Sequence, residues 1–309
     1  MFLSFAALLS ICVVVLASPT SEKRQSITIL SNDQIAKFKP YTFFAAAAYC
    51  QPPTTLAWNC GAICQANPSF KPVASGGDGK AIQFWYVGYD PTLKTVIVAH
   101  QGGFKPLQAK ITDFKAAQSN LNPSLFPGVP SAVQVHLGFK EEQEKTALEV
   151  LASVKKALSE NSANQVTVVG HSLGGALATL DGVYLRLQLP SSTNVTVINY
   201  AAPRVGNPDF ANFVDSHVPF TRITNKKDFV PTLPGQKFFS PKPFAHPNGE
   251  LHINADNTWA SCPGHDNPDK QCTVGSVPIF ALGVLHEGVD HRGPYDGVRI
   301  AADGACKSP

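Results

Sequence analysis

The stretch Val168-Val169-Gly170-His171-Ser172-Leu173-Gly174-Gly175-Ala176 decides the fold of this chain. A run of β-branched residues, 166–169, leads into it and predicts a buried strand. A segment rich in small residues, 176–187, follows and predicts a helix. Gly170-x-Ser172-x-Gly174 between a strand and a helix is the pattern of a nucleophile elbow, a sharp turn that lifts a serine hydroxyl clear of the backbone. The alternative interpretation is an ordinary Gly/Ser turn before a helix.

The segments around this turn alternate between predicted strands and predicted helices. One helix is expected to begin at a capping box at Ser31 and to end at 45–48. A second is expected at 141–160, where Leu148, Leu151, Val154 and Leu158 recur at helical spacing. Further strands are expected at 82–89, 95–99, 132–135, 195–200 and 221–224. This order predicts one α/β domain, residues 25–309, with a mainly parallel central sheet covered by helices on both faces. Beyond about residue 232 the chain is rich in Pro and Gly, and no element is predicted there.

Composition excludes several classes of protein. The chain has 309 residues, of which 44% are hydrophobic and 15% charged, so it can bury a full core and is not disordered, collagenous or a coiled coil. With 25 basic and 22 acidic residues the net charge is only +3, and basic runs are few, which argues against a nucleic-acid-binding protein.

The first residues of the chain predict export. Phe2 to Leu16 is almost wholly apolar and, at about fifteen residues, is shorter than the roughly 20 that a helix needs to span a bilayer. Val15-Leu16-Ala17 suits a signal-peptidase site, so residues 1–17 are expected to be a signal peptide. The alternative is an uncleaved anchor. A polar propeptide, 18–24, ends in the dibasic pair Lys23-Arg24, so the mature chain is expected to begin at Gln25. We therefore expect a secreted, extracellular protein without an integral membrane span.

Cysteine usage agrees with export, because an even number of cysteines outside the cytosol indicates disulfides. Six cysteines allow fifteen pairings, and proximity in the sequence favours Cys60–Cys64 and Cys262–Cys272, which leaves Cys50–Cys306. The alternative is a metal site at Cys262-x2-His265-x6-Cys272. Asn194 carries the one acceptor sequon for N-glycosylation.

A serine nucleophile needs a base and an acid that orients the base, and in hydrolases of this pattern the order is Ser, then Asp or Glu, then His. Asp228 is favoured as the acid because it follows the strand at 221–224, at the sheet edge where catalytic loops gather; the alternative is a solvated acid beside Lys226 or Lys227. His171 is interpreted as a packing residue, since neighbours in a sharp turn diverge. The other downstream acids are Asp209, Asp215 and Asp256, and the candidate bases are His246, His252, His265, His286 and His291. Composition hardly separates His291 from His286.

Four segments in order resemble the signatures of the fungal class 3 lipases, which are triacylglycerol lipases on an α/β-hydrolase fold. They are 170–176, Ala201-Ala202-Pro203-Arg204-Val205-Gly206-Asn207, 225–231 and Asp290-His291-x-Gly293-Pro294-Tyr295. The resemblance extends from about residue 45 to Cys306. It implies a triad of Ser172, Asp228 and His291, with His286 as the second candidate base, and it implies neither a metal nor an organic cofactor. The three expected disulfides also fit the family pattern.

The chain departs from this family at the oxyanion loop. The family usually has Arg or Gln, then Gly, then Thr or Ser after the strand at 95–99, whereas this chain has His100-Gln101-Gly102-Gly103. Backbone N–H groups of Gly103 and Leu173 are still expected to hold the oxyanion. The alternative is a plain Gly-Gly turn.

Phe104, Leu107 and Ile111 follow at helical spacing and resemble the family's lid; the alternative is a surface helix packed permanently on the core. The resemblance implies a lipase that binds acylglycerols at an oil–water interface. The alternatives are an esterase for soluble or feruloyl-type esters, and a non-catalytic binding protein on the same scaffold.

Overall fold

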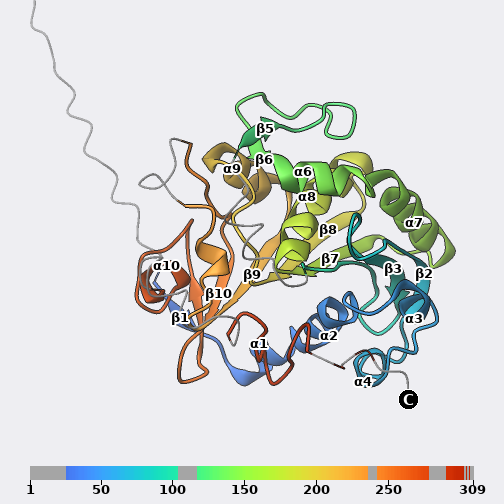
Figure 1. Ribbon diagram of the computed structural model, residues 1–309, viewed down its shortest axis with the longest axis horizontal. Coiled ribbons are helices and arrows are strands. Elements are labelled where there is room, and N and C mark those ends of the chain that lie inside the picture. Colours follow the sequence, from blue (N-terminus) through green and yellow to red (C-terminus); the bar gives the residue numbers. More distant parts are fainter. Residues whose placement is uncertain are drawn as a thin grey trace, which may run out of the picture.

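The computed structural model of the chain describes residues 26–103, 117–235, 242–277, 290–302, 304 and 306. The expected signal peptide, 1–17, and propeptide, 18–24, lie outside these residues. The described part forms a nine-stranded sheet that runs across the molecule between two layers of helices (Figure 1).

The sheet is parallel in its centre and antiparallel at both edges, which makes it the mixed, mainly parallel sheet of an α/β fold. Strands β4, β7, β8, β9 and β10 run parallel, and β1, β11, β3 and β2 pair antiparallel outside them. The spatial order is β1 (Thr28–Ile29), β11 (Trp259–Cys262), β10 (Glu250–Ile253), β9 (Phe220–Asn225), β8 (Asn194–Tyr200), β7 (Gln165–His171), β4 (Thr95–His100), β3 (Trp85–Asp90) and β2 (Lys71–Gly76).

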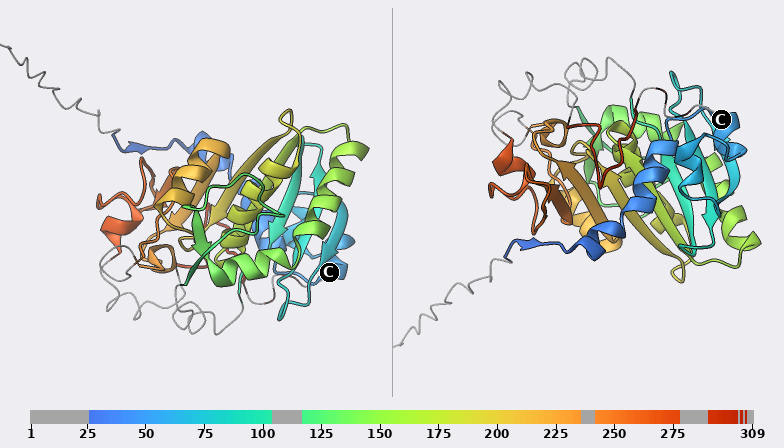
Figure 2. Two further views of the ribbon diagram at one scale, coloured as in Figure 1. Left: turned by 90° about the horizontal axis from the view of Figure 1, so that it is seen from above. Right: turned by 90° about the horizontal axis from the view of Figure 1, so that it is seen from below.

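The central strands are buried on both faces because alternate side chains enter two different cores. In β4, Val96 and Val98 pack into one core, whereas Ile97 and Ala99 pack into the other. The first core lies under α7 (Ala147–Glu160) and α8 (Leu173–Gln188), and the second lies under α2 (Lys39–Ala47). Figure 2 shows these helices on opposite sides of the sheet. The continuous β-branched runs in the sequence are explained by this double burial.

Shorter elements complete the two layers. They are α1 (Asn32–Ala36), α3 (Pro52–Leu56), α4 (Ala62–Gln65), α6 (Leu137–Glu144), α9 (Pro208–His217), α10 (Thr273–Ser276) and the 3-10 turn η1 (Val230–Thr232). A second sheet consists of β5 (Gln118–Asn120) and β6 (Gln134–His136). The strand expected at 132–135 therefore corresponds to β6 and lies outside the main sheet. Two backbone hydrogen bonds, from the His136 N–H to the Val205 carbonyl and from the Asn207 N–H to the Gln134 carbonyl, join β6 to the segment between β8 and α9.

The first expected helix is wrong in its extent. Its capping box at Ser31 forms, with reciprocal hydrogen bonds to Gln34, but the helix ends at Ala36 and α2 begins at Lys39. Pro40 explains the break, because a proline inside a helix has no N–H to donate and its ring collides with the carbonyl of the residue four positions earlier, here Ala36.

The helix expected at 141–160 is also two helices, α6 and α7. Of its expected apolar residues, Leu151 and Val154 are buried and Leu158 packs against the same core, whereas Leu148 lies outside the buried stripe and is 69% exposed. The strands β2, β10 and β11 were not predicted, and two of them lie in the Pro- and Gly-rich part of the chain.

Three disulfides link the described residues: Cys50–Cys306, Cys60–Cys64 and Cys262–Cys272. Cys60–Cys64 and Cys262–Cys272 are the pairs favoured by proximity, and Cys50–Cys306 is the pair that these two leave. Cys262 and Cys272 are thus not free to bind a metal, and the described residues contain no group of three or more potential metal ligands. No helix among the described residues is long and apolar enough to cross a membrane.

Candidate active site

Ser172 occupies the turn between β7 and α8 in a backbone conformation that non-glycine residues rarely adopt. Its φ is 58° and its ψ is −126°. The Ser172 N–H donates to the carbonyl of Tyr200 on the adjacent strand, at 2.9 Å, which fixes the turn against β8. A strained serine at the carboxyl end of a central parallel strand is the arrangement expected of a nucleophile elbow.

The glycines around Ser172 are required by close backbone approaches. A Cβ on Gly170 would lie 2.1 Å from the Gly174 carbonyl oxygen, and a Cβ on Gly174 would lie 2.2 Å from the His100 carbonyl oxygen. A Cβ on Gly175 would meet that of Ala202 at 2.7 Å. The glycines therefore allow α8 to begin directly against the ends of β7 and β4.

Asp228 and His291 meet at this same edge of the sheet. Asp228 lies in the turn after β9 and is buried; its Oδ1 accepts a hydrogen bond from the Val230 N–H at 3.0 Å. Its Oδ2 lies 2.9 Å from Nδ1 of His291. Since an ionised carboxylate can only accept, Nδ1 of His291 carries the proton, and its Nε2 is left as the basic nitrogen.

The turn that carries His291 is itself held to the end of β9. Asn225 donates from Nδ2 to the carbonyl of Asp290 at 2.8 Å, and the Lys227 N–H donates to the Asp290 carboxylate at 3.1 Å. The acid and the base are therefore fixed relative to one another through backbone as well as side-chain contacts.

The other described candidate histidines have different partners. His246 Nε2 lies 2.7 Å from the Pro231 carbonyl, and His265 pairs with Asp215. His252 contacts the hydroxyls of Thr224 and Ser276. Among the histidines that the structure describes, only His291 hydrogen-bonds Asp228; His286 lies outside the described residues.

The Ser172 hydroxyl is buried and, within the described part of the chain, has no hydrogen-bond partner. Catalytic hydrogen bonds are often open in unliganded structures and close when substrate binds. The imidazole of His291 is nevertheless adjacent to the elbow, because its ring centre lies 4.6 Å from that of His171, the residue before Ser172.

The expected oxyanion donors lie on the two segments that converge on Ser172. Leu173 is the first residue of α8, where N–H groups have no partner within the helix, and Gly103 lies three residues after the end of β4. Beneath that loop His100 Nε2 lies 2.6 Å from the carboxylate of Asp181 in α8, and Gln143 Nε2 donates to the same carboxylate at 2.7 Å. The candidate lid residues Phe104, Leu107 and Ile111 lie outside the described residues.

Sequence reasoning did not assign a role to Arg204, although it stands in one of the family signatures. Its guanidinium is almost fully buried, donates from Nε to Asp266 at 2.9 Å and also donates to the carbonyls of Thr232, the last residue of η1, and of Pro234 just after it. The sequence feature that could have indicated a buried, paired arginine is its position between two apolar segments. Arg204 has a structural role, because it holds in place the segment that follows Asp228.

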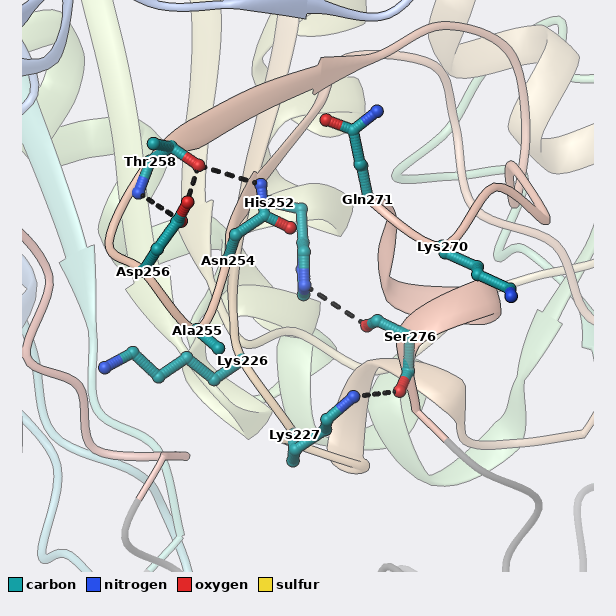
Figure 3. A pocket seen from close by; sticks show the side chains of 10 residues that line it. All are labelled: Lys226, Lys227, His252, Asn254, Ala255, Asp256, Thr258, Lys270, Gln271 and Ser276. Atoms are coloured by element: carbon teal, nitrogen blue, oxygen red, sulfur yellow. Dashed lines mark hydrogen bonds between the residues drawn. The ribbon is translucent and has the colours of Figure 1, made fainter.

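A pocket of about 430 Å³ is lined in part by Lys226 and Lys227, the two residues that precede the candidate acid in the sequence (Figure 3). Apart from Ala255, the residues that line it are polar or charged, and they include Lys226, Lys227, Lys270 and His252. Burial lowers the pKa of His252 to about 4, so this ring is neutral at pH 7. A cavity lined in this way does not suit an acyl chain, which requires apolar walls.

A strained serine between a parallel strand and a helix, with a His–Asp pair at the same sheet edge, places the chain in the α/β-hydrolase class. Residues 97–238 match the family described as lipase (class 3). The chain is 31% identical over 243 residues to the secreted mono- and diacylglycerol lipase 1 of Fusarium solani, a match that covers 74% of this chain and 69% of the relative.

Two further comparisons involve Rhizopus niveus. Its lipase is 29% identical over 267 residues, 85% of this chain but 64% of the relative, so the chain spans less than two thirds of that relative's length. The structure of lipase II from the same fungus superposes with a TM-score of 0.75 at 28% identity, covering 91% of this chain and all of that chain. The chain belongs to the class 3 lipase family.

Proposed function

We propose that this chain is a secreted carboxylic-ester hydrolase that acts on acylglycerols, with Ser172 as nucleophile, His291 as base and Asp228 as the residue that orients the base. The observation that carries the proposal is the 2.9 Å contact between His291 Nδ1 and the buried Asp228 carboxylate, beside the strained Ser172. Six cysteines joined in three disulfides and the secreted relative from Fusarium solani support export.

The proposed reaction is acyl transfer in two steps. Nε2 of His291 takes the Ser172 proton as the Ser172 oxygen attacks the ester carbonyl, and His291 then gives this proton to the departing alcohol. The acyl group remains on Ser172 as an ester. A water molecule, deprotonated by His291, attacks that ester, and the proton returns to Ser172 as the fatty acid leaves.

Asp228 and two backbone groups act on the charged species in these steps. The Asp228 carboxylate stabilises the imidazolium form of His291 and holds its ring in the required tautomer. The N–H groups of Leu173 and Gly103 donate to the oxyanion of each tetrahedral intermediate. The buried setting of Ser172 strengthens these interactions, since little water competes with them.

The test compares three alanine variants on a soluble short-chain ester. Ser172→Ala and His291→Ala are expected to lower kcat by roughly 10⁴ or more, and His286→Ala to change it little. The opposite order for the two histidines would move the base to His286. Undiminished hydrolysis by Ser172→Ala would overturn the proposed nucleophile.

The substrate class is tested with esters of increasing acyl length, measured below and above their solubility limits. A lipase is expected to prefer acylglycerols and, if Phe104, Leu107 and Ile111 belong to a lid, to increase in specific activity when substrate passes its solubility limit. Leu107→Ser should weaken that increase. Smooth saturation through the limit, with preference for feruloyl or other soluble esters, would favour the esterase instead.

A further inference from the structure

His171 lies at the centre of a hydrogen-bonded chain that the proposed mechanism does not use. It immediately precedes Ser172 and is 1% exposed. Its Nε2 lies 2.7 Å from the backbone carbonyl oxygen of His291, and its Nδ1 lies 2.7 Å from the hydroxyl of Tyr49. One ring therefore joins α2's carboxyl end to the backbone of the candidate base.

The direction of these hydrogen bonds follows from the acceptor at one end. A carbonyl oxygen can only accept, so Nε2 of His171 must carry a proton and donate it to His291. Burial, together with the nearby His291, holds the pKa of His171 well below its usual value, so its Nδ1 keeps a lone pair. The Tyr49 hydroxyl must then donate to Nδ1, and one tautomer of His171 is fixed.

Tyr49 also contacts the oxyanion loop. A Cβ on Gly102 would lie 2.1 Å from the Tyr49 hydroxyl oxygen and 2.6 Å from the His171 carbonyl oxygen. Burial raises the pKa of the Tyr49 phenol, and the positive charge of Arg292 opposes that rise. The hydroxyl thus packs against the Gly102 backbone on one side while it donates to His171 on the other.

Tyr295 supports the same carbonyl from a second direction. Its hydroxyl is fully buried and donates to the carbonyl oxygen of His291 at 2.9 Å. The two donors, His171 and Tyr295, use both lone pairs of that oxygen. His171 and Tyr295 therefore fix the backbone of His291, while Asp228 fixes its ring.

Resting on the proposed function, we infer that Tyr49 and His171 are positioning residues that link the oxyanion loop to the base. The Gly102 backbone packs against the Tyr49 hydroxyl, Tyr49 donates to His171, and His171 donates to the His291 carbonyl. The arrangement sets the donor at Gly103 and the proton acceptor at His291 relative to one another. It also restrains a loop that lacks the usual hydroxyl at position 103.

The first test removes the Tyr49 hydroxyl alone. Tyr49→Phe is expected to lower kcat on a soluble ester about ten- to a hundredfold with KM nearly unchanged, because small displacements of catalytic groups cost rate. Tyr86→Phe is the matched control: Tyr86 is also buried, and its hydroxyl donates to the Phe44 carbonyl at 2.7 Å, away from this chain of bonds. Equal kcat in the two variants would overturn the inference.

The second test replaces the ring. Glutamine at 171 can donate to the His291 carbonyl and accept from Tyr49, so His171→Gln is expected to retain most of the kcat that His171→Leu loses. In the His171→Leu background, Tyr49→Phe should cost less than it does alone, since the two residues act through one chain of bonds. Equal losses for glutamine and leucine, or fully multiplicative losses in the double variant, would contradict the link.

A third measurement does not depend on activity. In ¹⁵N spectra of the histidine rings at pH 7, His171 is expected to be neutral and protonated on Nε2, with its signal assigned by its disappearance in His171→Gln. A charged ring, or a proton on Nδ1, would overturn the inference. If the wild-type chain hydrolysed no ester, the proposed function would fail and these spectra would still decide the hydrogen-bond chain; if it hydrolysed esters and Tyr49→Phe behaved like Tyr86→Phe, only the inference would fail.

Discussion

Two adjacent glycines, Gly102 and Gly103, have different reasons to be glycine. Gly102 is pressed against the Tyr49 hydroxyl and the His171 backbone, so no side chain fits there. Gly103 stands where family members usually carry a hydroxyl, and its proposed contribution is a backbone N–H that any residue would supply. A glycine adds conformational freedom, worth about 0.5–1 kcal/mol relative to alanine in regular structure.

Replacing Gly103 by Ser or Thr is therefore expected to keep the fold and to maintain or raise kcat, because the loop loses freedom and its donor remains. The measurement is kcat on a soluble ester together with the melting temperature. Gly102→Ser is the comparison variant and should lose both activity and stability, since its Cβ would lie 2.1 Å from the Tyr49 hydroxyl oxygen. A large loss in both Gly103 variants would show that glycine is needed there.

Local pattern identifies some site residues and not others. Ser172 and Asp228 follow strands that can be read from β-branched runs, so their place at the sheet edge was predictable. Tyr49 and Arg204 act through contacts with segments distant in the sequence: Tyr49 with His171, and Arg204 with Asp266. No periodicity of a single segment reports such contacts.

At the level of elements, the central strands were predictable and the borders were not. Strands β4, β7 and β8 are buried on both faces, so their sequences are continuous apolar runs. The edge strand β1 is exposed, and β2 is only partly buried, which leaves a weaker pattern. Helix borders depend on single residues such as Pro40. In α7 only the first turn was misjudged, where Leu148 is exposed.

The disulfides join elements over very different lengths of chain. Cys50 follows α2 and pairs with Cys306 across a separation of 256 residues, whereas Cys60 and Cys64 are separated by 4. In the chain-entropy description, a longer loop restricts the unfolded chain more, by about 5 kcal/mol for the long loop and about 2 kcal/mol for the short one.

Replacing Cys50 and Cys306 together by alanine is therefore expected to lower the free energy of unfolding more than the same change at Cys60 and Cys64. Urea unfolding of the two double variants, at one pH and temperature, gives the comparison. A loss for the short loop that equals or exceeds the loss for the long one would contradict this account.

For the whole molecule, buried neutral histidines connect stability to pH. Burial lowers the pKa of His136 and of His252 to about 4, and it also holds the pKa values of His171 and His246 well below the usual range. The unfolded chain binds protons at these residues near pH 6.5, whereas the folded chain resists them. Stability is therefore full above about pH 6.5 and is lost as the pH falls toward 4.

The expected slope is up to about 1.4 kcal/mol per pH unit for each such histidine. His136→Phe should reduce the acid loss, because it removes one proton site and keeps a ring against Phe139, whose ring centre lies 4.3 Å away. Urea unfolding at pH 7.5, 6 and 4.5 measures the change, with the exposed His217→Phe as control. An unchanged slope in His136→Phe, or an equal change in the control, would refute the assignment.

The left-handed backbone of Ser172 has an evolutionary consequence. Its φ of 58° is relaxed for glycine and costly for other residues, so the chain would be more stable with glycine at this position. Under the proposed mechanism that glycine variant is inert, and selection for catalysis keeps the serine there. In a descendant lineage that had given up hydrolysis and kept the scaffold for binding, drift toward stability would replace Ser172 by glycine early, and that replacement would mark the loss of the enzyme more clearly than changes at Asp228 or His291.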